Sequence, residues 1–106
     1  MIKIFVVIFA VIALSAIPAA AAAADGKAVF DKSCKTCHGA NGEGNPAIAK
    51  VMKVELHALG SSEVQSKSDA DLKVAVTKGV GKMKPVAGLS AKQVDDVVAF
   101  VRTLKK

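Results

Sequence analysis

Two cysteines and a histidine stand close together in one short stretch of the chain, Cys34-Lys35-Thr36-Cys37-His38. Residues three and four positions apart lie on the same side of a helical turn, so Cys34, Cys37 and His38 can face one target together. Thiols at this spacing can pair with each other, bind a metal ion or bond to a cofactor, and imidazole is a common metal ligand. We therefore expect these three side chains to act as one site.

Covalent attachment of haem explains every residue of this C-x-x-C-H pattern. The thiols of Cys34 and Cys37 would add to the two vinyl groups on one edge of the porphyrin, and the imidazole of His38 would reach the iron. A dithiol redox pair would need a thioredoxin-like βαβ context, which the sequence lacks. A zinc site would need four ligands, and His57 is an isolated fourth; a disulfide leaves His38 unexplained. We predict one covalently bound haem c with its iron.

The second axial ligand of that iron must come from elsewhere in the chain. The candidates are Met52, His57 and Met83. Met83 lies in the glycine- and proline-containing stretch 79–85, which can cross the face of a haem as a loop, whereas Met52 lies in an apolar stripe suited to core packing. We predict Met83 as the ligand, with His57, Met52 and an open iron site as the alternatives. A thioether ligand favours reduced iron and raises the potential.

The first 24 residues have the layout of a secretory signal peptide. Lys3 supplies a positive start, residues 4–17 are almost entirely apolar, and an alanine tract ends before Asp25. We predict cleavage after Ala24 and export to an oxidising compartment. The alternative is an uncleaved membrane anchor, because residues 4–24 approach the roughly 20 needed to span a bilayer.

Residues 25–106 then form one small domain. The chain carries 15 basic and 9 acidic residues, and only Lys3 of these lies in the first 24, so the domain remains basic. Its aromatic residues are Phe30 and Phe100. So short a chain buries little apolar surface and usually needs a metal, a cofactor or another cross-link.

The rest of the domain favours helices separated by glycine-rich loops. Asp25 is a candidate N-cap for a first helix, which the loop beginning at Gly39 ends. Residues 47–59 fit either a helix or a strand. A further helix starts at Ser68 or Asp69 and stops at Gly79, and residues 78–88 form a loop.

The last helix, capped by Ser90, is the clearest element. Its apolar face comprises Val94, Val97, Val98, Phe100, Val101 and Leu104, and its polar face comprises Lys92, Asp95, Asp96 and Thr103. No strand pattern competes with these helices, so the predicted class is all-α.

These features together resemble a small class I cytochrome c of the bacterial periplasm. The resemblance runs through most of residues 25–106. It is carried by Gly26 and Phe30, the Cys34–His38 motif, Gly44-Asn45-Pro46, Gly81-Lys82-Met83-Lys84-Pro85, and Phe100-Val101-Arg102-Thr103-Leu104. It implies three to five helices wrapped around one haem, with the first and last helices crossing.

The resemblance also implies roles for particular residues. Gly26 and Phe30 would meet the Phe100 region at the helix crossing. The Pro46 carbonyl would accept the proton of His38 Nδ1 and orient the proximal ligand. Met83 would be the distal ligand. Two positions depart from a common form of the family, since Phe100 replaces a frequent Tyr or Trp and Lys84 separates Met83 from a proline.

An iron with both axial positions filled is closed to substrate, so we predict a one-electron carrier and not an enzyme. His57 has no partner in the sequence that suggests an acid–base pair. Lysines flank the predicted ligands (Lys35, Lys50, Lys53, Lys73, Lys78, Lys82 and Lys84) and suggest a basic surface for acidic redox partners; an evenly basic surface is the alternative. We expect a monomer that does not bind nucleic acid and meets membranes only through its partners or an uncleaved signal.

Overall fold

The computed structural model describes residue 8 and residues 18–106, so most of the predicted signal peptide lies outside the described residues. The helices of this part are α1 (Ala19–Ser33), α2 (Lys35–His38), α3 (Pro46–Met52), α4 (Ser62–Gln65), α5 (Asp69–Lys78) and α6 (Ala91–Thr103). Helices are the only regular elements here, which confirms the all-α class. The described part has six helices where three to five were predicted, because α2 and α4 are single turns of four residues each. Over the described residues, no helix is long and apolar enough to cross a membrane.

Helix α1 begins earlier than the sequence predicted. It starts at Ala19 after Pro18, so Asp25 is an interior residue and its predicted role as N-cap is wrong in this chain. Alanine is the strongest helix former and therefore extends the helix through the tract that precedes Asp25. The helix also ends before the expected glycine loop, because the backbone leaves helical geometry at Cys34 (φ −121°) and α2 follows as a separate turn.

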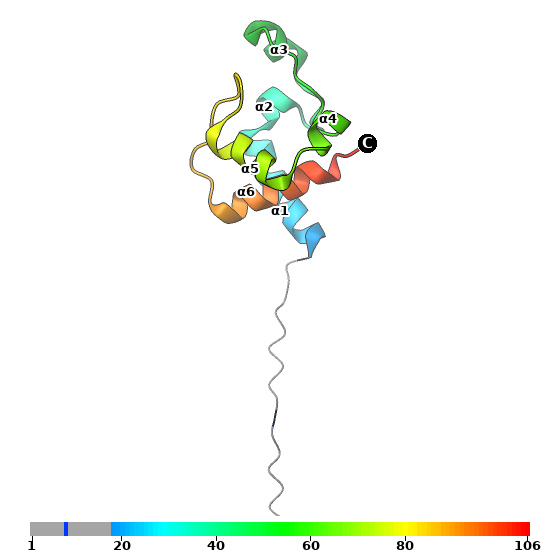
Figure 1. Ribbon diagram of the computed structural model, residues 1–106, viewed down its shortest axis with the longest axis vertical. Coiled ribbons are helices and arrows are strands. Elements are labelled where there is room, and N and C mark those ends of the chain that lie inside the picture. The colour runs from blue at the N-terminus through cyan, green and yellow to red at the C-terminus, as the bar shows by residue number, and fades with distance from the viewer. Residues whose placement is uncertain (1–7, 9–17) are drawn as a thin grey trace, which may run out of the picture.

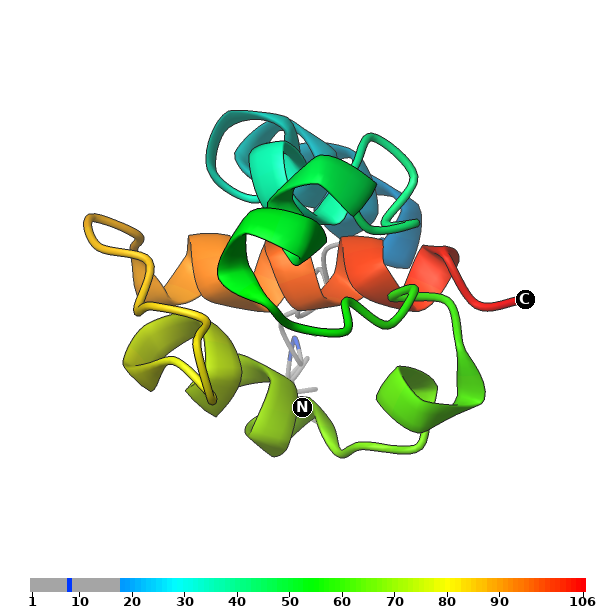
Figure 2. The ribbon, with the colours of Figure 1, turned by 90° about the horizontal axis from the view of Figure 1, so that it is seen from above.

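Helix α6 lies across the middle of the molecule, with α1 and α2 on one side and α4 and α5 on the other (Figure 2). Ser90 caps it as predicted, and Gln93 completes a reciprocal capping box with Ser90. The predicted apolar face is confirmed at its buried members, Val94, Val97, Val98 and Phe100.

The predicted exposure of Asp96 is wrong, since only 5% of this residue is accessible. The α1 backbone crosses directly over it, and its carboxylate is paired with Lys92 Nζ at 2.6 Å. The same ammonium lies 3.4 Å from Asp25 of α1. A buried carboxylate needs such a partner, because losing its hydration is costly.

Helices α1 and α6 cross each other (Figure 1). At the crossing, Gly26 lies directly against the backbone of Asp96 and Val97. A methyl group on Gly26 would overlap the Asp96 carbonyl, so only glycine permits this approach. One turn further on, the Phe30 and Phe100 rings pack with centroids 5.0 Å apart and a tilt of 52°. The predicted crossing of the first and last helices is therefore confirmed.

The middle of the chain wraps around this pair. Residues 47–59, which fitted either a helix or a strand, divide into α3 and an irregular segment after Lys53. Helix α5 is capped by Ser68 and ends at Gly79, as predicted.

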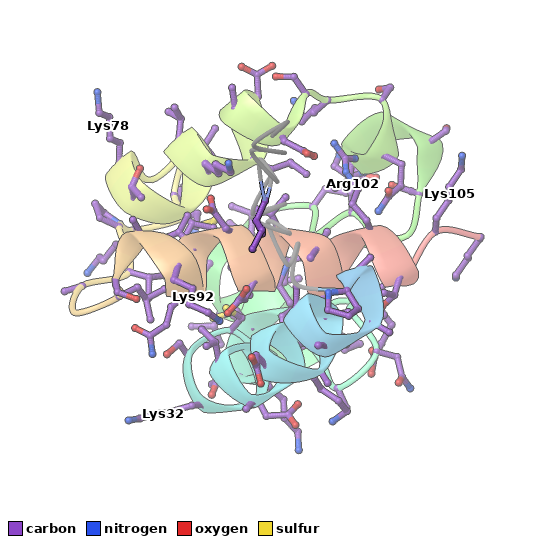
Figure 3. All side chains as sticks on the ribbon, turned by 90° about the horizontal axis from the view of Figure 1, so that it is seen from below. Lys32, Lys78, Lys92, Arg102 and Lys105 are labelled. Carbon is purple, nitrogen blue, oxygen red and sulfur yellow. The ribbon has the colours of Figure 1, made fainter. Side chains whose placement is uncertain are left out.

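Arg102 of α6 fastens the connection between α4 and α5 to the core. Its guanidinium donates to the carbonyls of Gln65 and Lys67, at 3.0 and 2.6 Å, and to the Asp69 carboxylate at 2.8 Å. Figure 3 shows Arg102 between α6 and this connection. This contact holds one wall of the site in place.

Candidate functional site

The Cys34–His38 segment forms a compact turn directly after α1. The amide of Cys34 donates to the Phe30 carbonyl at 2.8 Å, and the amide of His38 donates to the Cys34 carbonyl at 3.0 Å. The motif is therefore joined to the α1–α6 crossing through Phe30. Both cysteines are half-buried.

Asn45 braces this turn from the opposite side, a role that the sequence analysis missed. Its amide donates to the Cys37 carbonyl at 2.8 Å, and its side-chain Nδ2 donates to the Thr36 carbonyl at 3.1 Å. Its Oδ1 accepts from the Ala47 amide and caps α3. The sequence Asn45-Pro46 did signal the cap, because asparagine before a proline at the first helical position is a common helix start. The contact with the cysteine turn required the tertiary structure.

An apolar cavity lies between this turn, α5 and α6. Its volume is about 80 Å³, and its mouth is open to solvent. Three predicted site residues, Cys34, His38 and Met83, line it together. The other lining residues are Phe30, Leu59, Val64, Leu72, Ala75, Val76, Val97, Val98 and Val101. Cys37 is not among the lining residues, although it belongs to the same turn as His38.

Met83 reaches the cavity from a tight turn. The amides of Val80 and Met83 donate to each other's carbonyls at 3.0 and 2.9 Å. Gly81 has φ 56°, which the first central position of a type II′ turn requires and glycine adopts without strain. The turn is further tied to α5 at its base, where the Val86 amide donates to the Val76 carbonyl at 2.9 Å.

The alternative ligands lie elsewhere. His57 is 44% exposed in its side chain, and its Nδ1 is 3.0 Å from the Glu63 carboxylate. Met52 ends α3. Neither residue lines the cavity, so Met83 is the candidate that the geometry favours.

The hydrogen bond from His38 Nδ1 to the Pro46 carbonyl stays a prediction. Among the described residues, His38 Nδ1 is buried without a hydrogen-bond partner. Pro46 is the first residue of α3, and a carbonyl in the first turn of a helix points along the helix toward the amide four residues later.

Burial sets the protonation of the site. It raises the pKa of the Cys34 thiol to about 11, and the nearby Cys37 adds to this increase. Cys34 is thus a neutral thiol at neutral pH, unlike the low-pKa cysteine of a dithiol redox pair. Burial also lowers the pKa of His38 from its usual 6.5, which favours the neutral imidazole that binds metals.

These residues fit a haem better than a lone metal ion. Within the described residues there is no cluster of three or more His, Cys, Asp or Glu side chains suited to holding a metal ion. The cavity instead offers one imidazole, one thioether and apolar walls. Imidazole and thioether are axial ligands that haem iron takes, and apolar walls suit a porphyrin ring.

Comparison with known proteins leads to the same class. The family model described as Cytochrome c matches residues 23–105. Cytochrome c-554(547) of Halothiobacillus neapolitanus is 33% identical over 89 residues, which cover 78% of this chain and 97% of that protein. The solved structure of the KustC0563 c-type cytochrome is similar with a TM-score of 0.67 and 27% identity, covering 77% of this chain and 99% of that one.

The protein is therefore a small helical haem protein, and the chain belongs to the cytochrome c family. The family carries covalently bound haem c with its iron and serves as an electron carrier. That Cys34 and Cys37 are the attachment residues of this haem stays a prediction from the C-x-x-C-H pattern.

Proposed function

We propose that the protein is a periplasmic one-electron carrier in which His38 and Met83 are the two axial ligands of a single haem. The observation that carries this proposal is the position of Cys34, His38 and Met83 on one apolar cavity, although His38 and Met83 are 45 positions apart in the sequence. When bound, the haem supplies an iron that is reversibly oxidised and reduced by one electron.

The chain's own residues would hold that iron in a closed site. His38 would bind from the cysteine turn and Met83 from its hairpin, which leaves no iron position for a substrate. The apolar walls would exclude water, and this favours the reduced state because it carries less charge. No acid–base pair serves the cavity among its lining residues, which supports a carrier and not an enzyme.

Absorption spectroscopy of the oxidised, haem-loaded protein tests the axial pair. Ligation of iron by methionine gives a weak red charge-transfer band, which we expect in this protein. The absence of this band would refute Met83 as the ligand and would favour a ligand-binding sensor or a weak peroxidase instead.

We further propose that residues 1–24 are a signal peptide and that residues 25–106 are the working domain. The family match begins at residue 23, two residues before the proposed mature start. Intact-mass measurement of protein isolated from the periplasm should give residues 25–106 plus one haem. Retention of residues 1–24 would favour an anchored subunit of a larger complex.

The basic surface is proposed to meet acidic redox partners. Lys32 of α1, Lys78 of α5 and Lys105 of the C-terminal tail point outward in different directions (Figure 3). Among the lysines near the predicted ligands, Lys73 is already paired with Asp95 at 2.8 Å. A partner guided by charge should bind more weakly as the salt concentration rises.

A further inference from the structure

We propose that Lys82 is a positioning residue that fastens the Met83 turn to the C-terminal end of α3. The proposal rests on the His38/Met83 axial pair proposed above. Lys82 lies at the tip of the Val80–Met83 turn, and its Nζ donates a hydrogen bond of 2.7 Å to the Met52 carbonyl. This contact joins segments 30 residues apart. Figure 1 shows the loop after α5 reaching toward α3.

The end of α3 is a suitable place to attach a cation. Met52 is the last residue of this helix, and the left-handed Lys53 (φ 54°) follows it. The last four carbonyls of a helix have no amide partner within the helix, and they carry the negative end of its dipole. The Lys82 ammonium therefore meets an acceptor that is both available and electrostatically favourable.

The turn itself is rigid but is tied to the domain mainly at its base. Its two backbone hydrogen bonds join Val80 to Met83, so this segment moves as a unit. The bond between Val86 and Val76 fixes the base of the loop to α5. The Lys82 contact adds a second attachment, at the tip. With both attachments present, the Met83 side chain is held at the cavity; without the second, the turn can swing outward.

This attachment affects how often the distal iron position opens. An external ligand binds only the fraction of molecules in which Met83 has left the iron, so its apparent affinity is proportional to that fraction. A variant that lacks the attachment should populate the open state more and bind the external ligand more tightly. Imidazole is a suitable probe because it is uncharged above its own pKa. Removing the positive charge of Lys82 therefore has little direct electrostatic effect on imidazole binding.

The test compares three variants of the full haem-loaded protein in the oxidised state. Lys82→Gln removes the ammonium, Lys84→Gln removes an equal charge from an exposed residue on the other side of Met83, and Lys82→Arg keeps both charge and donor. We expect Lys82→Gln to bind imidazole roughly fivefold more tightly, equivalent to ~1 kcal/mol. Lys84→Gln and Lys82→Arg should stay within about twofold of the original protein.

Hydrogen exchange at the Val80 and Met83 amides gives a second readout that does not depend on ligand binding. We expect faster exchange in Lys82→Gln only. An equal change in Lys82→Gln and Lys84→Gln, or no change in either, would overturn the proposal. If the original protein lacks the red charge-transfer band, the His38/Met83 axial pair is refuted. Hydrogen exchange at the Val80 and Met83 amides would then still decide whether Lys82 fastens the turn.

Discussion

At the scale of single residues, the behaviour of the iron depends on which candidate for its second axial ligand faces the cavity. Met83 lines it, whereas Met52 ends α3 and His57 pairs with Glu63 at the surface. A thioether in the second axial position raises the potential and closes the iron to external ligands. The identity of this ligand therefore distinguishes a carrier from a ligand-binding haem protein.

Replacing Met83 tests this assignment directly. In Met83→Ala we expect the haem to remain attached, because Cys34 and Cys37 are unchanged, while the reduced protein gains carbon monoxide binding. Optical titration with carbon monoxide measures this gain. Met52→Ala is the matched control and should remain closed to carbon monoxide; binding in that variant instead of Met83→Ala would show that Met52 is the ligand.

At the scale of elements, the crossing of α1 over α6 positions the cysteine turn. Gly26 sets the separation of the two helices, and the Phe30–Phe100 pair fills the space one turn further along. Phe30 also lines the cavity and accepts the hydrogen bond from the Cys34 amide. A shift at the crossing would therefore be transmitted to the haem site.

We expect Gly26→Ala to destabilise the folded protein by about 1–3 kcal/mol, because the new methyl group would overlap the Asp96 backbone. This loss would occur although alanine improves intrinsic helix propensity by ~1 kcal/mol. Denaturant unfolding measures the effect. Ala28→Gly is the control: at this exposed site on the same helix, the substitution changes only the intrinsic helix propensity. A Gly26→Ala protein that is more stable than the original would contradict the close crossing of α1 and α6.

The loop between α2 and α3 contains a pH-dependent contact. The backbone amides of Glu43 and Asn41 donate to the Glu43 carboxylate, and the Asn41 bond is 2.8 Å. These bonds lower the pKa of Glu43 below its usual 4.5. A lowered pKa in the folded state means that the carboxylate stabilises the fold above the unfolded pKa. That contribution is lost as the pH falls through the folded value.

Glu43→Gln should therefore melt at a lower temperature than the original protein near neutral pH. The difference should disappear in acid, once the pH is well below the lowered pKa of Glu43 and the original carboxyl group is also neutral. Thermal melts across this pH range measure the difference. Glu55→Gln controls for the change in net charge, and a difference that persists unchanged in acid would contradict the proposed contact.

At the scale of the whole molecule, the protein has little apolar core of its own. Among the described residues, the buried apolar side chains are Phe30, Val94, Val97, Val98 and Phe100. All but one belong to α6, and the cavity lies between this helix and the rest of the domain. The haem would complete the core because it fills that space.

A protein without attached haem should consequently lose its cooperative fold. We expect Cys34→Ser/Cys37→Ser, purified free of haem, to show a reduced helical circular dichroism signal and no cooperative thermal transition. Thr36→Ser, which keeps both cysteines, should fold normally with haem attached. A haem-free double variant with a sharp native-like transition would show that the helices pack stably alone.

The sequence alone determined the features that depend on short spacings. The motif Cys34–His38, the caps Ser68 and Ser90 and the amphipathic α6 each involve residues within a few positions of one another. Their geometry follows from the 3.6-residue period and from local hydrogen bonds. Met83 was also predictable as a ligand candidate, because it lies in a glycine- and proline-containing loop and not in an apolar stripe.

Only the tertiary structure decided the features that join distant segments. It buried Asp96 beneath α1, placed Asn45 against the cysteine turn and brought Lys82 to the end of α3. It also buried His38 Nδ1 without a hydrogen-bond partner among the described residues. These outcomes depend on where two helices cross and how a loop folds back, and no local spacing encodes those positions. The cysteine–histidine motif identified the chemistry, and the packing decided which residues surround it.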